Sequence, residues 1–250
     1  MQRRNALHFC LRRIWHTVNE KYKKKKGINM EIKCTKKCEK EYPKRLLKME
    51  NAPNKLYYLG DILLLDKNIV ALIGKRDVSE KVMKTTKRCG EILAECGTVV
   101  LNGLAIGCDT AGLEGALTAG GKCVAVMPCG LDYVYPKCNE ALLKKILQNG
   151  GCIVSEYEVG TRPERWRFVA RDRIQAMLSD KIVVVECEEK SGTMHTVKAG
   201  MEYGKSLACI VRAKEPVLPS GNIWMLKNGA AGLKGENALR KFVNGATGMM

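Results

Sequence analysis

Short aliphatic runs alternate with longer amphipathic segments from Asn68 onward. Continuous apolar runs of this length predict strands that are buried on both faces, as in a parallel sheet covered by helices. Strand, helix and strand in repetition imply right-handed crossovers and a doubly wound sheet. The expected strands cover residues 69–73, 98–101, 123–127, 152–155, 182–186 and 207–211.

A helix is expected between the first two strands. Asp77 precedes its apolar positions as the N-cap, Glu80 completes a capping box, and Gly97 ends the segment. The fold class that follows is α/β, with a Rossmann-like doubly wound, mainly parallel sheet and helices on both faces.

The chain divides into four expected segments. These are a basic N-terminal extension (1–29), a lead-in that packs against the sheet (30–67), the Rossmann-like domain (68–230), and a C-terminal helix and tail (231–250). The last helix is expected near residues 237–242, after an irregular stretch beyond Val211.

Basic residues outnumber acidic ones, with a formal net charge of +17 and a pI near 9.4. A charge of this sign favours polyanionic partners such as nucleic acid. Residues 1–29 contain nine Lys or Arg and one Glu, so they carry 9 − 1 = +8 and the rest carries 17 − 8 = +9. This extension is interpreted as a nucleic-acid-binding arm or a disordered tail. A third hypothesis makes it non-native: Lys25-Lys26-Gly27 can be encoded by a ribosome-binding sequence just before a start codon at Met30.

The cysteines and histidines do not form a metal-binding pattern. Most of the 12 cysteines stand singly in apolar runs, which is typical of small buried side chains in a reducing compartment. Cys34 and Cys38 form a close pair without a second pair at zinc-site spacing. No apolar run reaches the roughly 18 residues that span a bilayer. We therefore expect a cytoplasmic protein with no metal, no cofactor and no membrane partner.

Glycines, cations and polar residues follow the expected strands. Because the carboxyl ends of parallel strands meet at one sheet edge, where helix N-termini offer free N–H groups, these loops predict a phosphate-binding site. The alternative is that all of them are structural turns. The candidate DNA-binding residues in these loops are Gly74, Lys75, Arg76, Gly103, Gly107, Lys137, Asn139, Ser191, Gly192 and Thr193, and Asp109, Asp132 and Asp172 are candidates for structuring the loops.

The segment 166–174 interleaves arginines with aromatic residues. Arginines bind phosphates and aromatic rings stack on unpaired bases, which favours Arg171 and Arg173 as further DNA contacts. The alternative is an amphipathic helix with Phe168, Ile174 and Leu178 in the core and solvated arginines.

Other nucleotide-binding and catalytic patterns are missing from the sequence. No G-x-G-x-x-G follows a strand, and Gly120-Gly121-Lys122 precedes a strand, which is inconsistent with a P-loop. His195 has no obvious catalytic partner, and Asp109 is better explained as an N-cap that orients the glycine loop than as an acid or base. We therefore expect no catalytic residues and a protein that is not an enzyme.

Together these loops resemble the DNA-processing protein A (DprA/Smf) family between about residues 42 and 230. The resemblance rests on these sequences, in this order: Tyr42-Pro43, Gly74-Lys75-Arg76, the segment 103–109, Gly130-Leu131-Asp132, Tyr135-Pro136, Asn139, Ser155-Glu156, Arg171-Asp172-Arg173-Ile174 and Ser191-Gly192-Thr193. It implies a single-stranded DNA-binding protein that acts in DNA uptake, natural transformation and homologous recombination. It also implies a homodimer that protects the strand and loads a RecA-type recombinase, with phosphates at Arg76, Lys137 and Ser191 to Thr193.

Several positions depart from the family pattern, which implies a divergent or minimal member. Lys75, Leu113 and Val169 replace a serine, a histidine and a proline, and Asp172 replaces an asparagine. Asp172 brings a negative charge near the expected phosphates, which weakens binding unless Arg171 or Arg173 pairs with it. The alternative functions are a sensor or hydrolase of a nucleotide-derived small ligand, or a structural or mobile-element protein with nonspecific basicity.

Overall fold

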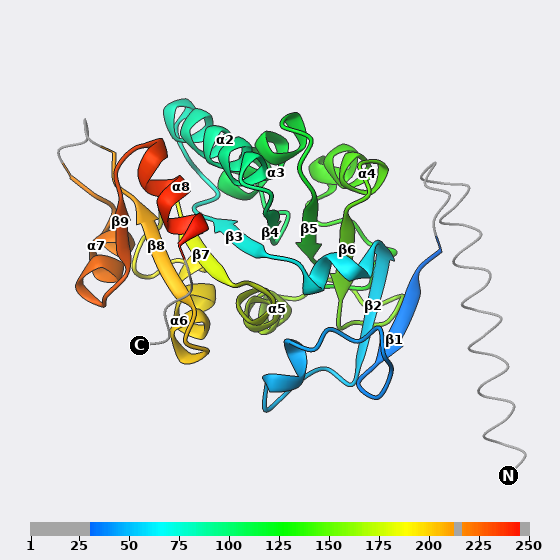
Figure 1. Cartoon of the computed structure of the whole chain (residues 1–250). Coiled ribbons are helices and arrows are strands. Elements are labelled where there is room, and N and C mark those ends of the chain that lie inside the picture. Colours follow the sequence, from blue (N-terminus) through cyan, green and yellow to red (C-terminus); the bar gives the residue numbers. More distant parts are fainter. Residues whose placement is uncertain (1–30, 213–216, 246–250) are drawn as a thin grey trace, which may run out of the picture.

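The structure, a computed structural model, describes residues 31–212 and 217–245. Their strands form a sheet of nine strands in the order β1-β2-β6-β5-β4-β3-β7-β8-β9 (Figure 1). From β6 to β9 all neighbouring strands pair in parallel. The expected α/β fold, doubly wound and mainly parallel, is confirmed.

The parallel strands coincide with the aliphatic runs to within two residues at each end. All residues of β3 to β7 are buried, because helices cover the sheet on both sides. The strands are β3 (Ile69–Ile73), β4 (Val99–Asn102), β5 (Cys123–Val126), β6 (Cys152–Ser155), β7 (Lys181–Val184) and β8 (Ser206–Ile210).

The lead-in segment extends this sheet. Strand β1 (Lys33–Lys36) pairs antiparallel with β2 (Lys55–Gly60), and β2 pairs antiparallel with β6. The short helices η1 (Leu46–Lys48) and η2 (Ile62–Asp66) contribute apolar residues to the same hydrophobic cluster as Leu56 of β2. The Tyr42 hydroxyl donates to the Pro53 carbonyl at 2.6 Å. The division at residues 67 and 68 stays a prediction.

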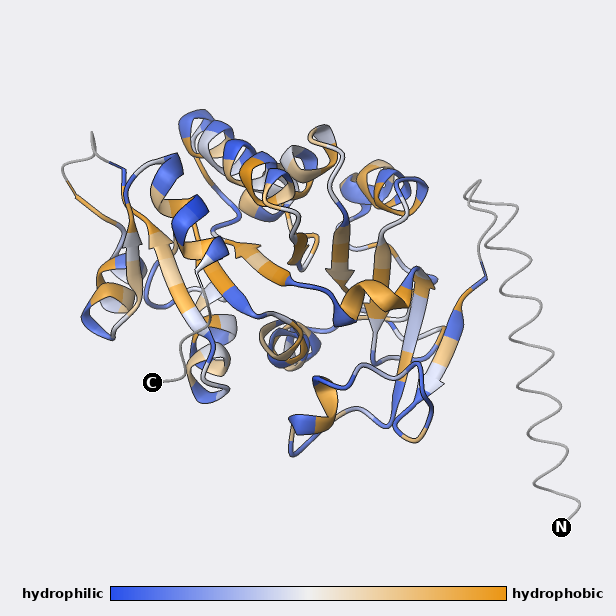
Figure 2. Cartoon of the chain, in the orientation of Figure 1, coloured by the Kyte–Doolittle hydropathy of each residue, from blue (hydrophilic) through white to orange (hydrophobic). Residues whose placement is uncertain are grey.

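Helices cover both faces of the sheet. One face carries α2 (Glu80–Glu95), α3 (Cys108–Thr118), α4 (Glu140–Gln148), which follows the short helix η3 (Lys137–Asn139), and α8 (Glu236–Asn244). The other carries α5 (Arg165–Leu178), α6 (Thr193–Glu202) and α7 (Ser220–Lys227). Apolar residues therefore concentrate along the inner strands and the inward sides of the helices (Figure 2).

Two expected helix caps were wrong. Helix α2 is capped by Ser79, whose Oγ accepts from the Val82 N–H at 3.4 Å, and Glu80 is its first residue. Asp77 lies too far before that first turn to accept its N–H groups. Helix α3 begins after Gly107, so Asp109 is its second residue and not its N-cap.

The C-terminal region contains more regular structure than expected. Helix α7 and the short strand β9 (Ala231–Leu233) precede α8, and β9 pairs with β8. The extension 1–29 lies outside the described residues. Within those residues the cysteines are free thiols, and no helix combines the length and apolar character needed to cross a bilayer.

Candidate functional site

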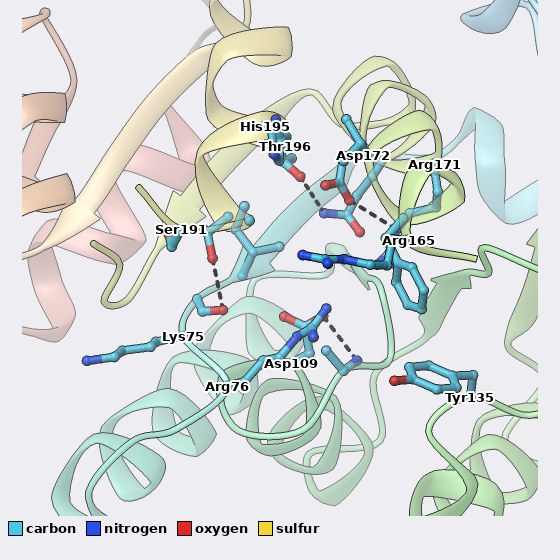
Figure 3. A pocket seen from close by; sticks show the side chains of 18 of the residues that line it. Lys75, Arg76, Asp109, Tyr135, Arg165, Arg171, Asp172, Ser191, His195 and Thr196 are labelled. Atoms are coloured by element: carbon cyan, nitrogen blue, oxygen red, sulfur yellow. Dashed lines mark hydrogen bonds and ion pairs between the residues drawn. The ribbon is translucent and has the colours of Figure 1, made fainter. Parts of the chain in front are cut away.

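A pocket of about 600 Å³ opens at the carboxyl edge of the sheet, where β3 and β7 lie side by side. The chain leaves β3 toward α2 on one face and leaves β7 toward α6 on the other, so the loops diverge and leave a crevice between them. The side chains that line this crevice come from the loops after β3, β4, β5 and β7, from the start of α3, and from α5 and α6 (Figure 3).

The glycine-rich loop after β4 is held in place by the buried side chains of Asp109 and Asn139. Asp109 Oδ2 accepts from the N–H groups of Gly103 at 3.0 Å and Ala105 at 3.3 Å. The Asn139 amide donates to the Leu104 carbonyl at 2.8 Å and to Thr110 Oγ1 at 2.8 Å. Asp109 therefore holds the backbone of this loop from the second residue of α3. Asn139, predicted as a DNA contact, is only 6% exposed, and its amide donates its hydrogen bonds to other residues of the chain.

Glycine at position 107 permits the closest approach between two of the loops. Its φ is +77°, and a Cβ built there would lie 2.3 Å from the Arg76 carbonyl oxygen. The Cys108 N–H donates to the Lys75 carbonyl at 3.1 Å. The loops after β3 and β4 are thus joined through their backbones, which places the Arg76 side chain at the rim of the pocket.

Arg171 lies on the floor of the pocket, beside the carboxylates of Asp109 and Asp172. Its Nη1 donates to the Val126 carbonyl at 2.8 Å, and its Nε lies 3.0 Å from Asp172 Oδ1. Arg171 therefore partly compensates the negative charge of Asp172. This pairing is the condition, expected from the sequence, under which Asp172 does not weaken phosphate binding. Burial raises the pKa of Asp172, and Arg171 opposes that shift.

Asp109 is buried beside the same arginine. Desolvation raises its pKa to about 6, although Arg171 and the N–H groups of Ala105 and Gly103 act in the opposite direction. The carboxyl is therefore ionised at neutral pH but gains its proton in mildly acidic solution.

Exposed cations and aromatic rings surround the mouth of the pocket. The Arg76 guanidinium lies 5.8 Å from the ring centroid of Phe168, and the Phe168 ring meets that of Tyr135 edge to face at 5.1 Å. Arg165 enters the lining from the first residue of α5. Lys75 turns toward Glu188, with Nζ 3.3 Å from the carboxylate, so its charge is partly compensated. Arginines beside aromatic rings suit phosphates and unpaired bases.

The N-terminus of α6 forms the opposite wall. Thr193 Oγ1 donates to the Gly74 carbonyl at 3.1 Å, which ties this wall to the loop after β3. Ser191 Oγ is buried and has no hydrogen-bond partner among the described residues. No side chain or backbone atom lies within 4 Å of a Cβ placed at Gly192. The first turn of α6 thus offers N–H groups and a hydroxyl to an anion in the pocket.

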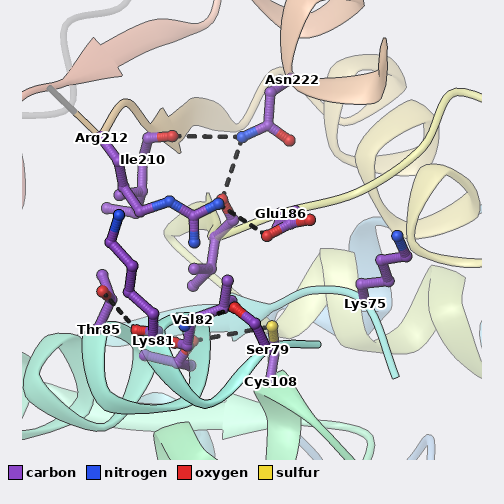
Figure 4. A network of polar contacts seen from close by, with 12 residues as sticks. Lys75, Ser79, Lys81, Val82, Thr85, Cys108, Glu186, Ile210, Arg212 and Asn222 are labelled. Atoms are coloured by element: carbon purple, nitrogen blue, oxygen red, sulfur yellow. Dashed lines mark hydrogen bonds and ion pairs between the residues drawn. The ribbon is translucent and has the colours of Figure 1, made fainter. Parts of the chain in front are cut away.

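Residues of α7 hold the loop after β7 in place (Figure 4). Asn222 accepts from the Cys187 N–H at 3.0 Å and donates to the Val185 and Ile210 carbonyls. Ser220 Oγ donates to Glu188 at 2.6 Å. The unexpected helix α7 therefore positions the loop that leads into Ser191.

Several predicted residues lie outside the lining of this pocket. Arg173 contacts Glu156 at 2.5 Å and donates to the Asn51 carbonyl at 3.0 Å, toward the lead-in segment. Lys137 is exposed on η3. Asp132 accepts from the Gly160 N–H at 2.9 Å, and its role in loop structure stays a prediction. Gly103 is buried beneath the guanidinium of Arg171.

The sequence interpretation missed part of the lining. Arg165, Gln175 and Thr196 were not predicted, and His195 was set aside as structural although it is exposed in the lining. Arg165 and Phe168 share one side of α5, a helical spacing that the sequence contains. Phe168 lies at the rim rather than in the core, whereas Ile174 and Leu178 are buried. Among the described residues, no group of His, Cys, Asp and Glu is arranged to hold a metal ion.

Comparisons with known proteins give a consistent result. The family model described as "DNA recombination-mediator protein A" matches residues 33–244. The chain is 32% identical to Protein Smf of Synechocystis over 80% of the chain and 51% of that protein. It is 35% identical to DNA processing protein DprA of Streptococcus pneumoniae over 80% of the chain and 71% of that protein. The chain thus spans about half of the first of these relatives and about seven tenths of the second.

A solved structure extends the similarity to three dimensions. DNA processing protein A from Helicobacter pylori, whose structure is described in terms of a unique single-stranded DNA binding mode, superposes with a TM-score of 0.75 and 30% identity. The match covers 86% of this chain and 95% of that one. A molybdenum cofactor carrier protein from Chlamydomonas reinhardtii and a molybdenum cofactor binding protein from Rippkaea orientalis, at 19% and 16% identity and TM-scores of 0.50 and 0.51, share the fold alone.

Proposed function

The chain belongs to the DNA recombination-mediator protein A family, and on that premise we propose that it binds single-stranded DNA in the pocket between β3 and β7. The sugar-phosphate backbone lies against the loop Gly74-Lys75-Arg76 and the first turn of α6, from Ser191 to Thr193. Arg76 and Arg165 neutralise phosphates at the rim, and Arg171 supplies positive charge from the floor.

One observation carries this proposal: cations, a helix N-terminus and aromatic rings converge on one pocket from elements far apart in sequence. Arg76 approaches the ring of Phe168, and Thr193 joins α6 to the loop of Gly74. Phosphates are bound by the first two kinds of group and unpaired bases by the third. A duplex keeps its bases stacked inside, so the rings favour a single strand.

The relatives' names support a role in DNA processing rather than in metabolism of a small nucleotide. The sensor or hydrolase considered from the sequence is therefore not favoured. We propose a non-catalytic protein that requires no cofactor. Asp109, the carboxyl whose pKa is raised most clearly in the pocket, accepts hydrogen bonds from the loop backbone, a structural role.

We further propose that the chain acts as a homodimer in the cytoplasm, where it protects single strands taken up during natural transformation and loads a RecA-type recombinase on them. The family description as a recombination mediator supports this step. Lys137 and Arg173 remain candidate contacts for the strand outside the pocket. Sedimentation measures the dimer, and recombinase ATPase on strands already coated by a single-strand-binding protein measures loading.

Fluorescence anisotropy tests the central proposal. The chain is titrated against a labelled single strand, the same sequence as a duplex, and mononucleotides as competitors. We expect the single strand to bind most tightly and the mononucleotides to compete weakly. Equal affinity for duplex and single strand, or no binding of either, contradicts the proposal.

A further inference from the structure

A second aromatic surface lies beside the pocket, on the first turn of α5 and the segment that follows β6. The side chain of Trp166 is 56% exposed, and its ring meets that of Tyr157 edge to face, with centroids 6.1 Å apart. The Arg167 guanidinium lies 4.8 Å from the Trp166 ring and 5.2 Å from the Tyr157 ring. We call these three residues the Trp166 platform. None of them lines the pocket.

The platform is fixed by hydrogen bonds. The Trp166 indole Nε1 donates to Glu164 Oε2 at 2.8 Å, and Arg167 lies 3.1 Å from the Glu164 carboxylate. Arg167 also donates to the Arg162 carbonyl, and its side chain is only 16% exposed. The indole is thus held in one orientation, although Trp166 as a whole is 56% exposed. A ring held in this way loses little freedom when a planar group stacks on it.

The chain places this platform next to the proposed path of the strand. Arg165, directly before Trp166, lines the pocket, and so do Phe168 and Val169 one turn later. Arg162 and Arg165 are both exposed, so cations accompany the rings along this turn. A polyanion that leaves the pocket over the start of α5 meets the platform next.

We propose that the Trp166 platform stacks an unpaired base of the strand that continues out of the pocket, and so forms a second binding site for single-stranded DNA. This inference rests on the proposed function. Aromatic rings bind bases of any sequence because every base has a π face, and the adjacent arginines hold the backbone. The platform therefore adds affinity for long strands only.

The test compares oligothymidylates of about 4 and about 16 nucleotides, the range of site sizes known for single-strand-binding folds. Anisotropy is measured with the full chain and with Trp166→Ala, Trp166→Phe and, as a matched control, Leu63→Ala. Leu63 is a comparably exposed apolar residue on η2. We expect Trp166→Ala to weaken binding of the long strand on the order of ten-fold, which corresponds to about 1.4 kcal/mol. Binding of the short strand stays unchanged, Trp166→Phe keeps most of the affinity, and Leu63→Ala behaves as the wild type.

Tryptophan emission supplies a second readout. In a chain with Trp15→Phe and Trp224→Phe, Trp166 is the single indole, and long strands should quench it while short strands do not. Unchanged affinity of Trp166→Ala for long strands, or an equal loss for both lengths, overturns the inference. Loss of self-association with full affinity for long strands assigns the surface to a second copy of the chain and also overturns it. If neither length binds to the wild type, the proposed function itself fails.

Discussion

Arg171 lies directly over Gly103: a Cβ built at Gly103 would stand 1.7 Å from Arg171 Nη1 and 2.4 Å from its Cζ. The guanidinium passes through the space that any other residue would fill, and reaches the Val126 carbonyl at the end of β5. Glycine is therefore required at position 103 because Arg171 occupies the space of a side chain, and not because of the backbone angles of Gly103.

Replacing Gly103 with alanine should displace Arg171. We expect Gly103→Ala to lower the free energy of unfolding by about 1–3 kcal/mol, because an added methyl in a packed site forces its neighbours to move. Affinity for a single strand should fall with it. Gly192→Ala is the matched control for stability, since a Cβ there has no neighbour within 4 Å. Denaturant titration compares the two; equal stability of both variants would contradict the close approach.

Arg173 is a candidate DNA contact in the sequence analysis, whereas in the structure it contacts Glu156 and Asn51. Arg173→Ala leaves Glu156 without its ion pair and the Asn51 carbonyl without its donor. We expect a loss of about 1–3 kcal/mol in stability and little change in the affinity for short strands. A large loss of affinity with unchanged stability would instead support the phosphate contact predicted from the sequence.

Thr193 joins two walls of the pocket by a single hydrogen bond. Thr193→Val removes the donor and keeps the shape, so we expect a several-fold loss of affinity, consistent with about 0.5–1.5 kcal/mol per hydrogen bond. Thr118→Val removes a comparable bond, from Oγ1 to the Glu114 carbonyl on the outer side of α3, and should leave binding unchanged. Anisotropy with a short strand distinguishes the two; identical affinities would show that this bond does not shape the site.

The raised pKa of Asp109 predicts a dependence of stability on pH. The folded chain holds this proton up to about pH 6, whereas the unfolded chain releases it near the ordinary value of 3.8. Stability contributed by the neutral carboxyl is therefore present at low pH and lost as the pH rises through this window. Relative to Asp109→Asn, the wild type should gain about 2–3 kcal/mol as the pH falls from about 7 to about 4. Denaturant titrations at several pH values measure this difference, and a difference independent of pH would contradict it.

The central strands were predictable because burial on both faces leaves a direct signal, an unbroken aliphatic run such as Ile69–Ile73. Strand β9 gave no such signal, because two of its three residues are exposed. Helix α7 was missed because Pro219 and Gly221 suggest a loop, yet Pro219 stands at the N-cap and Gly221 packs against Cys187. These elements depend on contacts with distant segments, which no local pattern reports.

The sequence predicted which loops line the pocket, but it did not predict which side of α5 faces the pocket. Glycines and cations after strands locate the edge of the sheet, whatever the details of packing. Arg171 and Arg173 are two positions apart on α5, about 200° around the helix, so only one of them can face the pocket. The sequence alone does not fix that rotation. The apolar positions Ile174 and Leu178 set it, because they pack on the sheet and turn Arg171 inward.

The salt dependence of binding tests most directly whether this pocket holds the phosphate backbone. Each cation that neutralises a phosphate of a single strand contributes about 0.7 to the slope of log affinity against log salt concentration. The slope for a short strand should therefore decrease by about 1.4 in Arg76→Ala with Arg165→Ala. It should remain unchanged when the exposed Lys227 and Lys241, on α7 and α8, are replaced together by alanine. An unchanged slope and affinity in the double arginine variant would contradict the proposed site.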